Sequence, residues 1–357
     1  MTIRVVLWTT GHIARFAGRA ILDDPDLELV GCFAHSAEKE GKDVGELIGR
    51  DPIGVVATTN IDEIIALAPD VVAYYSIMRQ DDVPWHIEQI GRLLQSGINV
   101  VTSSNFVTGQ WWKAEAMFDE AGRKGSASIY GSGVNPGFIN AFALTAASVC
   151  SDVSHISIWE EAECSGYNSK ELWETVAFGM PDGHEDNAGK FWQGTAVFED
   201  TVAMMADALE LPLDEICYLP EVATATKDLE LGFMDIPKGH VAGLKNRWVG
   251  MAGGREVIEL GTIWKMTDDV EPNWEIRHGW HIVVDGLPTI KAHVAGWPPE
   301  GETNSEVLMS LAMIMTALPT VNAIPHVVRA RPGVVTYKDL PLVTSARRVR
   351  TGDPKGA

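Results

Sequence analysis

The stretch from Val5 to Ile21, VVLWTTGHIARFAGRAI, constrains the fold of this chain most strongly. It begins with an apolar run typical of a buried strand, turns at Gly11, and continues with Ile13, Phe16 and further apolar residues at helical spacing. A strand, a tight turn and a helix in this order place backbone N–H groups and the positive end of a helix dipole at the turn. The stretch therefore predicts a Rossmann-type unit whose turn binds a pyrophosphate.

The glycine fingerprint of such turns, G-x-G-x-x-G/A, is only partly present. Its small positions read Thr9, Gly11 and Ala14. Gly11 keeps the position at which a side chain would block the phosphate, while Thr9 replaces the first glycine at a conformational cost. By itself this stretch also fits an ordinary strand–helix turn without a ligand. The predicted phosphate-binding residues of this turn are Thr9, Thr10, Gly11, His12 and Ile13.

The end of the second predicted strand, Leu27 to His35, bears on the choice of nucleotide. An acidic residue at this position commonly binds the ribose hydroxyl of NAD, whereas a cationic residue accommodates the 2′-phosphate of NADP. His35, Ser36 and Lys39 follow here, with no carboxylate directly after the strand. We therefore expect NADP to be preferred, with NAD possible. The alternative is that Lys39 belongs to a solvated loop.

Strand and helix patterns alternate as far as Gly133, which predicts a parallel sheet with right-handed crossovers. Ligands of such sheets bind beyond the carboxyl ends of the strands, so Ser76 and Ser103 are expected at the cofactor site. The turn GSGVNPGF adds Asn135 and Pro136, where the Asn135 amide can both donate and accept a hydrogen bond. A purely structural proline turn is the alternative.

After Cys150 the pattern changes to long alternating strands such as REVIELGTIWKM, which predict a half-buried antiparallel sheet. The expected fold class is α/β, with an N-terminal Rossmann domain and a C-terminal α+β domain whose sheet is mostly antiparallel. Helices are expected at about Ser169 to Gly179, Gly194 to Leu209 and Asn304 to Leu318. The expected parts are a dinucleotide-binding Rossmann domain over 1–140 and a substrate-binding and dimerisation domain over 141–302. A helix and segment over 303–335 are expected to pack back on the Rossmann domain, and a C-terminal tail follows over 336–357.

The composition narrows the classes of partner. The 357 residues carry a net charge of −21, so nucleic acid and anionic membranes are not expected partners. We count no apolar run approaching the roughly 20 residues that span a bilayer and no signal-peptide pattern, so a cytoplasmic protein is expected. The four cysteines lack metal-ligand spacing, and Cys32 and Cys164 are expected to be buried thiols. No metal site is expected.

The chain resembles the dihydrodipicolinate-reductase-like oxidoreductases, and within them the 2,4-diaminopentanoate dehydrogenase and native amine dehydrogenase branch. The resemblance covers nearly the full length and implies a homodimer, an NAD(P)H-linked reduction of C=O or C=N, and dimerisation through the C-terminal sheet. It rests on the segments VVLWTTGHIARFAGRAI, HSAEKEGKDVGEL, GSGVNPGF, SGYNSKELWETVAFG and TALPTVNAIPHVVRARPGVVTYKDLPLV.

Two departures from the family pattern limit what this resemblance implies. The paired histidines and the Gly-Thr pair that hold a dicarboxylate in dihydrodipicolinate reductases are absent from ECSGYNSKELWE. The branch glutamate that is thought to activate ammonia is replaced near Asn105. Reductive amination benefits from a carboxylate, whereas carbonyl reduction needs only a donor to the developing oxyanion. Weak or absent amination is expected unless Glu160, Glu161 or Glu163 reaches the site.

The remaining candidates concern substrate and proton transfer. Asn105, Asn135 and Tyr167 are the candidate catalytic residues, although a tyrosine beside a glycine is as often structural. The expected substrate is a small apolar carbonyl compound or amine, possibly with ammonia. Alternatives are a carbonyl or imine reductase without amination and a non-catalytic NADPH-binding sensor. The predicted apolar pocket wall, whose members are equally typical of a plain core, comprises Phe138, Phe142, Trp159, Phe178 and Trp192.

Overall fold

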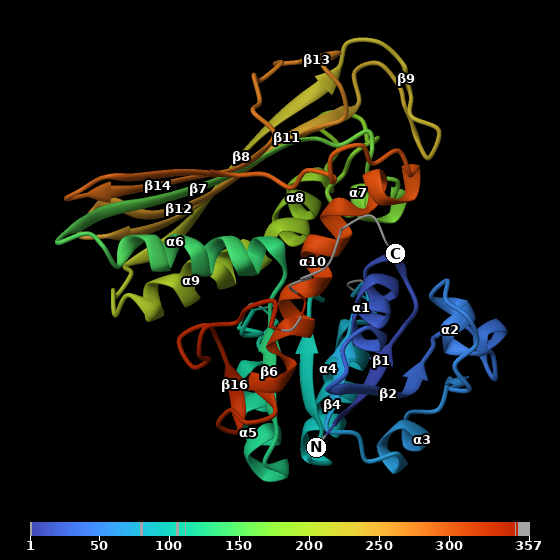
Figure 1. Ribbon diagram of the computed structural model, residues 1–357. Coiled ribbons are helices and arrows are strands. Elements are labelled where there is room, and N and C mark those ends of the chain that lie inside the picture. The colour runs from blue at the N-terminus through green and yellow to red at the C-terminus, as the bar shows by residue number, and fades with distance from the viewer. Residues whose placement is uncertain (1, 79–80, 105–106, 111, 347, 349–357) are drawn as a thin grey trace. The chain divides into compact units, whose positions relative to one another are not determined.

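The short apolar runs of the N-terminal part form a seven-stranded parallel sheet with the order β16-β6-β5-β4-β1-β2-β3 (Figure 1). Its central strand, β4, is buried along its whole length because helices cover such a sheet on both faces. The predicted Rossmann-type sheet is confirmed. The strands are β1 Ile3–Trp8, β2 Leu27–Phe33, β3 Ala57–Thr58, β4 Val71–Tyr74, β5 Asn99–Thr102, β6 Ser128–Gly131 and β16 Gly333–Val335.

The computed structural model describes residues 2–78, 81–104, 107–110, 112–346 and 348. The chain divides into unit 1, Met1–Phe138 with Ala312–Ala357, and unit 2, Ile139–Leu311. The domain boundaries expected from the sequence remain predictions. The helical segments of unit 1 before Phe138 are α1 His12–Leu22, η1 Ala37–Lys39, α2 Val44–Leu47, α3 Ile61–Ala66, α4 Val83–Gln95, α5 Glu115–Gly125 and η2 Val134–Phe138.

Helix α10, Ser305–Val327, is longer than the expected helix, which ended at Leu318. Pro319 and Pro325 lie inside it, and prolines normally end or kink a helix. By length and composition, α10 is the one described helix apolar enough to cross a membrane, which the count of apolar runs did not predict. Ala317 and Ile324 are fully buried in the core of unit 1, so packing holds the helix beyond its prolines.

The strands of unit 2 form a second seven-stranded sheet with the order β13-β8-β11-β12-β7-β14-β15. Only the described pair β12–β7 is parallel, so the expected, mostly antiparallel sheet is confirmed. The strands are β7 Val153–Glu163, β8 Glu215–Ala225, β11 Val241–Ala252, β12 Arg255–Lys265, β13 Val270–Glu271, β14 Gly279–Gly286 and β15 Ile290–Val294, beside a ribbon of β9 Leu229–Glu230 and β10 Asp235–Ile236.

Helices α6 and α9 run along one face of this sheet (Figure 1). The helix expected over Gly194 to Leu209 is two helices that meet at Ala196, and the helix expected over Ser169 to Gly179 is only six residues long. Helix α8 was not predicted from the sequence, because the segment at its start is rich in glycine and aspartate, a composition typical of a loop. The helices of unit 2 are α6 Ile139–Ala147, α7 Lys170–Thr175, α8 Asn187–Thr195 and α9 Val197–Ala208.

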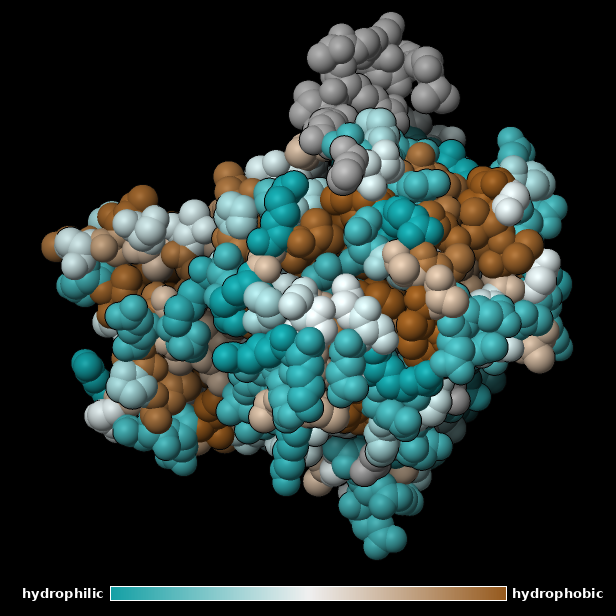
Figure 2. All heavy atoms as spheres, turned by 90° about the horizontal axis from the view of Figure 1, so that it is seen from below, coloured by the Kyte–Doolittle hydropathy of each residue, from teal (hydrophilic) through white to brown (hydrophobic). Residues whose placement is uncertain are grey.

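The surface carries hydrophobic patches among hydrophilic residues (Figure 2). On the face seen in Figure 2, teal and white residues surround separate brown patches. Most large apolar side chains are buried, and the strongly exposed ones among the described residues include Leu342, Trp297 and Leu287. Cys32 and Cys164 are buried free thiols, as predicted. Burial raises the pKa of the Cys32 thiol to about 12, so this thiol is uncharged and packs as an apolar group.

Candidate functional site

The predicted phosphate-binding residues lie in the turn between β1 and α1. Thr9 adopts a left-handed backbone with a φ of 79°, where the glycine of the family fingerprint would be unstrained. Gly11 is the N-cap of α1, and a Cβ placed on it would meet no heavy atom of the described chain within 4 Å. Ala14 is fully buried and allows α1 to pack closely on the sheet. The first turn of α1, which begins with His12 and Ile13, carries the N–H groups that no residue of the helix can bond and the positive end of the helix dipole.

Lys39 reaches back to this turn from the segment after β2. Its Nζ donates a hydrogen bond of 2.8 Å to Oγ1 of Thr10, which is itself buried. Ser36 is the N-cap of η1, the short helix that carries Lys39. The structure thus brings the Lys39 ammonium to the turn between β1 and α1. A cation next to open N–H groups is suited to bind an anionic group.

His35 and Ser76 meet at the ends of two strand segments of this sheet. Nε2 of His35 and Oγ of Ser76 share a hydrogen bond of 2.9 Å. Burial lowers the pKa of His35 below its usual value, and the nearby His86 lowers the pKa of His35 further. Trp85 lies beside His35, with their ring centroids 5.3 Å apart. The neutral His35 imidazole therefore acts here as a hydrogen-bonding and stacking group, and the positive charge of the cluster comes from Lys39.

Ser103, Asn135 and Pro136 follow β5 and β6 at the carboxyl edge of the same sheet. Asn135 and Pro136 are joined by a cis peptide bond within η2. Asn105, the position at which the family glutamate is expected, lies outside the described residues. The edge of unit 1 therefore gathers the turn, the Lys39 segment and the β5 and β6 ends, as parallel strands require.

Tyr167 belongs to an aromatic cluster of unit 2. Its ring lies edge-on to Trp173 at 5.8 Å, and Trp173 lies 5.3 Å from Phe178. Burial, followed by the negative charge of Glu160, raises the pKa of Tyr167, so its phenol remains a proton-bearing donor. Phe178 also lines a cavity of ≈ 290 Å³, whose other lining residues are Lys170, Glu174, Gly179, Met180, Lys190, Met234 and Asp235.

The five residues of the predicted pocket wall do not all come together. Trp159 lies over Gly261 on the sheet face opposite Trp264, and its Nε1 points to Glu259 Oε2 at 3.4 Å. Phe178 belongs to the cluster that contacts Trp264, so Trp159 and Phe178 are on opposite sides of the sheet. The reason is strand alternation, because the periodicity of one strand does not say which of its faces meets a given helix.

The other members of the predicted wall are partly exposed. Phe138 is the last residue of the first segment of unit 1, and its side chain is 45% exposed. Phe142 on α6 and Trp192 on α8 belong to unit 2 and are 38% and 40% exposed. The ring of Trp192 lies 6.5 Å from Trp248 of β11.

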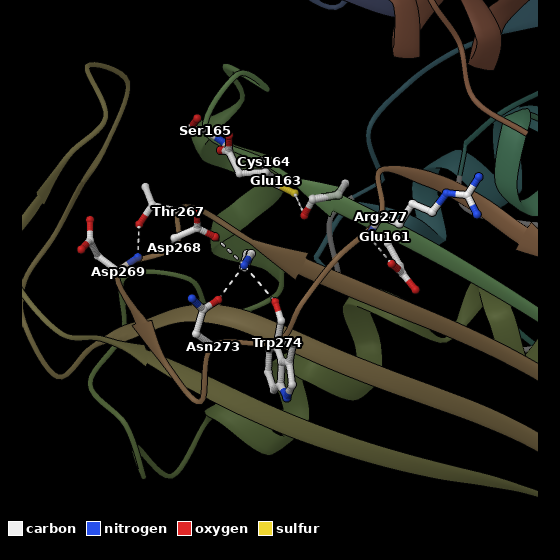
Figure 3. Close-up of polar contacts among 12 residues, drawn as sticks. Glu161, Glu163, Cys164, Ser165, Thr267, Asp268, Asp269, Asn273, Trp274 and Arg277 are labelled. Carbon is white, nitrogen blue, oxygen red and sulfur yellow. Dashed lines mark hydrogen bonds and ion pairs between the residues drawn. The ribbon is translucent and has the colours of Figure 1, made fainter. Parts of the chain in front are cut away.

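Several charged side chains that resemble site residues have structural partners. Figure 3 shows Asp268, Asn273 and Trp274 converging on one point, where their oxygens accept bonds of 2.7, 2.6 and 2.9 Å from the buried Nζ of Lys265. Lys265 therefore ties the end of β12 to the segment around β13. Glu161 accepts a bond of 2.6 Å from the backbone N of Arg277 on the neighbouring segment (Figure 3).

The sequence names Glu160 as one of three carboxylates that could reach the site, but it does not reveal the partners that hold this side chain. Its Oε1 accepts a bond of 3.0 Å from Trp264 Nε1, and its Oε2 accepts one of 2.9 Å from Trp280 Nε1. Both tryptophans are more than a hundred residues away in the chain. No local pattern could have paired them with Glu160.

A Rossmann-type sheet with a glycine at the start of its first helix, in a chain that also builds a mostly antiparallel sheet, is the architecture typical of dinucleotide-dependent oxidoreductases. A family model described as the 2,4-diaminopentanoate dehydrogenase C-terminal domain matches residues 139–351. The chain belongs to this family, and the predicted amine dehydrogenase branch is confirmed.

Relatives match along almost the whole chain. An amine dehydrogenase of Streptomyces virginiae is 27% identical over 95% of this chain and 96% of its own. A 2,4-diaminopentanoate dehydrogenase of Acetoanaerobium sticklandii is 24% identical over 95% and 94%. A solved structure of an amine dehydrogenase from Mycobacterium smegmatis has a TM-score of 0.76 at 19% identity and covers 96% of this chain and 97% of that one. This last likeness concerns the fold.

Proposed function

We propose that the chain is an NADP(H)-preferring amine dehydrogenase that interconverts a small, mainly apolar ketone or aldehyde with a primary amine. The observation that carries the proposal is the open turn at Gly11 with Lys39 hydrogen-bonded to Thr10 beside it. The activities of the two relatives, an amine dehydrogenase and a 2,4-diaminopentanoate dehydrogenase, support the choice of C–N chemistry.

The described residues fit a dinucleotide. The N–H groups of the α1 first turn would hold the pyrophosphate, Lys39 would pair with a 2′-phosphate, and Trp85 and His35 offer ring faces beside it. The bound nicotinamide supplies or accepts the hydride at the reacting carbon. The protein's own task is to exclude water, orient the substrate and place donors at the developing oxyanion. Asn135 and the protonated phenol of Tyr167 are our candidates for such donors.

The runner-up is a carbonyl reductase without amination. It is motivated by Asn105, because an amide cannot exchange protons near neutral pH as a glutamate does. Both proposals are tested by incubating the protein with NADPH or NADH and a panel of small aldehydes and cyclic ketones, with and without excess ammonium. Amine that forms only with ammonium supports the dehydrogenase, whereas alcohol under both conditions supports the reductase. NADPH binding without turnover of any compound would indicate a sensor.

The variant Asn105→Glu restores a carboxylate at the position that the resemblance gives to the family base. We expect it to raise amine formation relative to alcohol formation by about tenfold or more, since a positioned acid–base group contributes about 10²-fold or more to such steps. The measurement is the ratio of the two products at saturating ammonium, with Asn105→Gln as the matched neutral control. An unchanged product ratio in Asn105→Glu would place this residue outside the site.

We further propose a homodimer formed through the sheet face of unit 2 that lies opposite α6 and α9. This face carries Leu219, which is 44% exposed, and Trp159. Two ion pairs lie within this face, with Lys245 Nζ 2.8 Å from Glu221 and Arg247 bonded to Glu259. Apolar and aromatic side chains beside charges that are paired within the face suit self-association.

A further inference from the structure

The cavity that Phe178 lines belongs to unit 2 alone. Its walls come from α7, the segment after α7, α8 and the ribbon of β9 and β10. Its volume of ≈ 290 Å³ suits a small molecule and not a dinucleotide, since ligand pockets run from about 300 to 1,000 Å³. The lining combines charged side chains of both signs with apolar ones. This combination indicates a small ligand that has both charged and apolar parts.

The apolar part of the lining is held in the core of unit 2. Phe178 and Met234 are 1% and 8% exposed and belong to one buried cluster, against which Met180 packs. Val241 N donates to Met180 O at 2.8 Å, and Gly179 N donates to Val241 O at 2.9 Å, so β11 fixes the backbone beneath the cavity. One aromatic ring and two flexible thioethers form a floor that can adapt to an aliphatic group.

Two ammonium groups of the lining converge on Glu174 of α7. Lys190 of α8 donates a hydrogen bond of 3.1 Å from Nζ to the backbone oxygen of Glu174. Lys170 Nζ lies 3.6 Å from Glu174 Oε1. Each ammonium has three donors, and within the described part of the chain Glu174 is the one partner of either. Two positive charges beside one carboxylate leave further donors and an excess of positive charge, which suits the carboxylate of a ligand.

Negative charge enters the lining from the ribbon. Asp235 of β10 lines the cavity, and its cross-strand partner is Glu230 of β9, so the two carboxylates share one face of the ribbon. Like charges directly opposite each other destabilise a strand pair. Among the residues that the structure describes, no cationic side chain forms an ion pair with either carboxylate. The ammonium of a ligand at Asp235 would therefore reduce a repulsion that the protein leaves in place.

The charges of the lining select for a ligand with two charges. Two lysines and two acidic residues line the cavity, so a simple anion meets carboxylates and a simple cation meets ammonium groups. We infer that the cavity binds a free α-amino acid with an aliphatic side chain, in its zwitterionic form. The carboxylate lies at Lys170 and Lys190, the ammonium lies at Asp235, and the side chain lies on the apolar floor. Such binding needs neither cofactor nor turnover, so the site is independent of the proposed function.

Calorimetric titration of the full-length protein without cofactor tests the requirement for both charges. L-Leucine is compared with 4-methylpentanoate, which lacks the ammonium, and with 3-methylbutylamine, which lacks the carboxylate. We expect leucine to bind at least about tenfold more tightly than either analogue, because each charged group makes its own charge-assisted contacts. An analogue that binds as tightly as leucine overturns the inference, and so does the absence of leucine binding at about 20 mM.

Two variants separate the ends of the ligand. Asp235→Asn should weaken leucine binding about tenfold or more and should not weaken the binding of 4-methylpentanoate. Lys190→Met should weaken the binding of leucine and 4-methylpentanoate about tenfold and should not weaken that of 3-methylbutylamine. Glu215→Gln and Lys291→Met, at exposed positions of β8 and β15 outside the cavity, are the matched controls and should change leucine affinity by less than about twofold.

The crossed pattern distinguishes ligand contacts from structural roles. A folded variant that weakens all three compounds equally has lost structure in the cavity, and this result in both variants overturns the inference. Circular dichroism checks folding. Lys170→Met is the second lysine variant, because it removes a surface ion pair and no hydrogen bond to the backbone of α7.

The place of binding is measured with ¹³C-methyl-methionine-labelled protein. The resonances of Met180 and Met234 are assigned with Met180→Leu and Met234→Leu. We expect leucine to shift both resonances and to leave those of Met204 and Met205, which are buried in α9, unchanged. Leucine that moves neither Met180 nor Met234 is bound elsewhere and overturns the inference. The same measurement identifies 3-methylbutylamine that binds outside the cavity.

Discussion

Lys39 is the residue on which the proposed preference for NADP depends. Its ammonium is anchored to Thr10 beside the open Gly11 turn, whereas Lys42, three residues later, is exposed. We expect Lys39→Met to raise the Kd for NADPH about tenfold, as the loss of a charge-assisted contact predicts, with little effect on the Kd for NADH. Calorimetric titration of both nucleotides measures this, and Lys42→Met is the matched control. Equal weakening of both nucleotides would instead assign Lys39 a structural role in the turn.

The same turn shows how much a single residue reveals through its local sequence. The substitution of threonine for the first fingerprint glycine predicts a conformational cost, and Thr9 has the left-handed backbone that carries this cost. The role of Gly11 can also be predicted from its local sequence, because a residue without a side chain at the start of a helix leaves room for a ligand. These features depend on neighbours a few residues away. Glu160 is the opposite case, since its indole partners are remote in the chain.

At the scale of elements, α5 packs closely on β16, the edge strand of the Rossmann-type sheet that pairs with β6. A Cβ on Gly122 of α5 would lie 2.8 Å from Gly333 N and 2.9 Å from Gly333 Cα, which only a shift of backbone would relieve. We expect Gly122→Ala to lower the free energy of unfolding by about 1–3 kcal/mol through overpacking. Gly91→Ala on α4, where the nearest such atom is Met117 Cε at 3.9 Å, should raise it by up to about 1 kcal/mol.

Urea unfolding of the two alanine variants checks this contrast. A stabilised Gly122→Ala protein would show that α5 and β16 can separate without cost. Helix α10 illustrates the same tertiary control over an element. Pro319 and Pro325 predict a helix end, yet the helix continues to Val327 because its residues fill the core of unit 1.

At the scale of the whole molecule, the proposed dimer makes one face of the unit 2 sheet a contact surface. We expect the parent protein to sediment at twice the mass of one chain at micromolar concentration. Leu219→Arg introduces an unpaired charge at the proposed interface and should shift the equilibrium to monomer by at least about tenfold in Kd. Val56→Arg, at a position of unit 1 that is 56% exposed, is the matched control. A monomeric parent protein, or an unaffected Leu219→Arg dimer, contradicts the proposed interface.

The sequence by itself determined the parallel sheet, the strand, turn and helix around Gly11, the mostly antiparallel second sheet and the family branch. These follow from local patterns: apolar runs with period two, a glycine before a helix, and motifs read along the chain. Only the tertiary structure decided that β16 completes the first sheet and that α10 passes its prolines. It also decided that Trp159 and Phe178 lie on opposite sides of the second sheet, and that Trp264 and Trp280 hold Glu160. These features depend on strand register and on contacts between residues far apart in the chain, which no local pattern encodes.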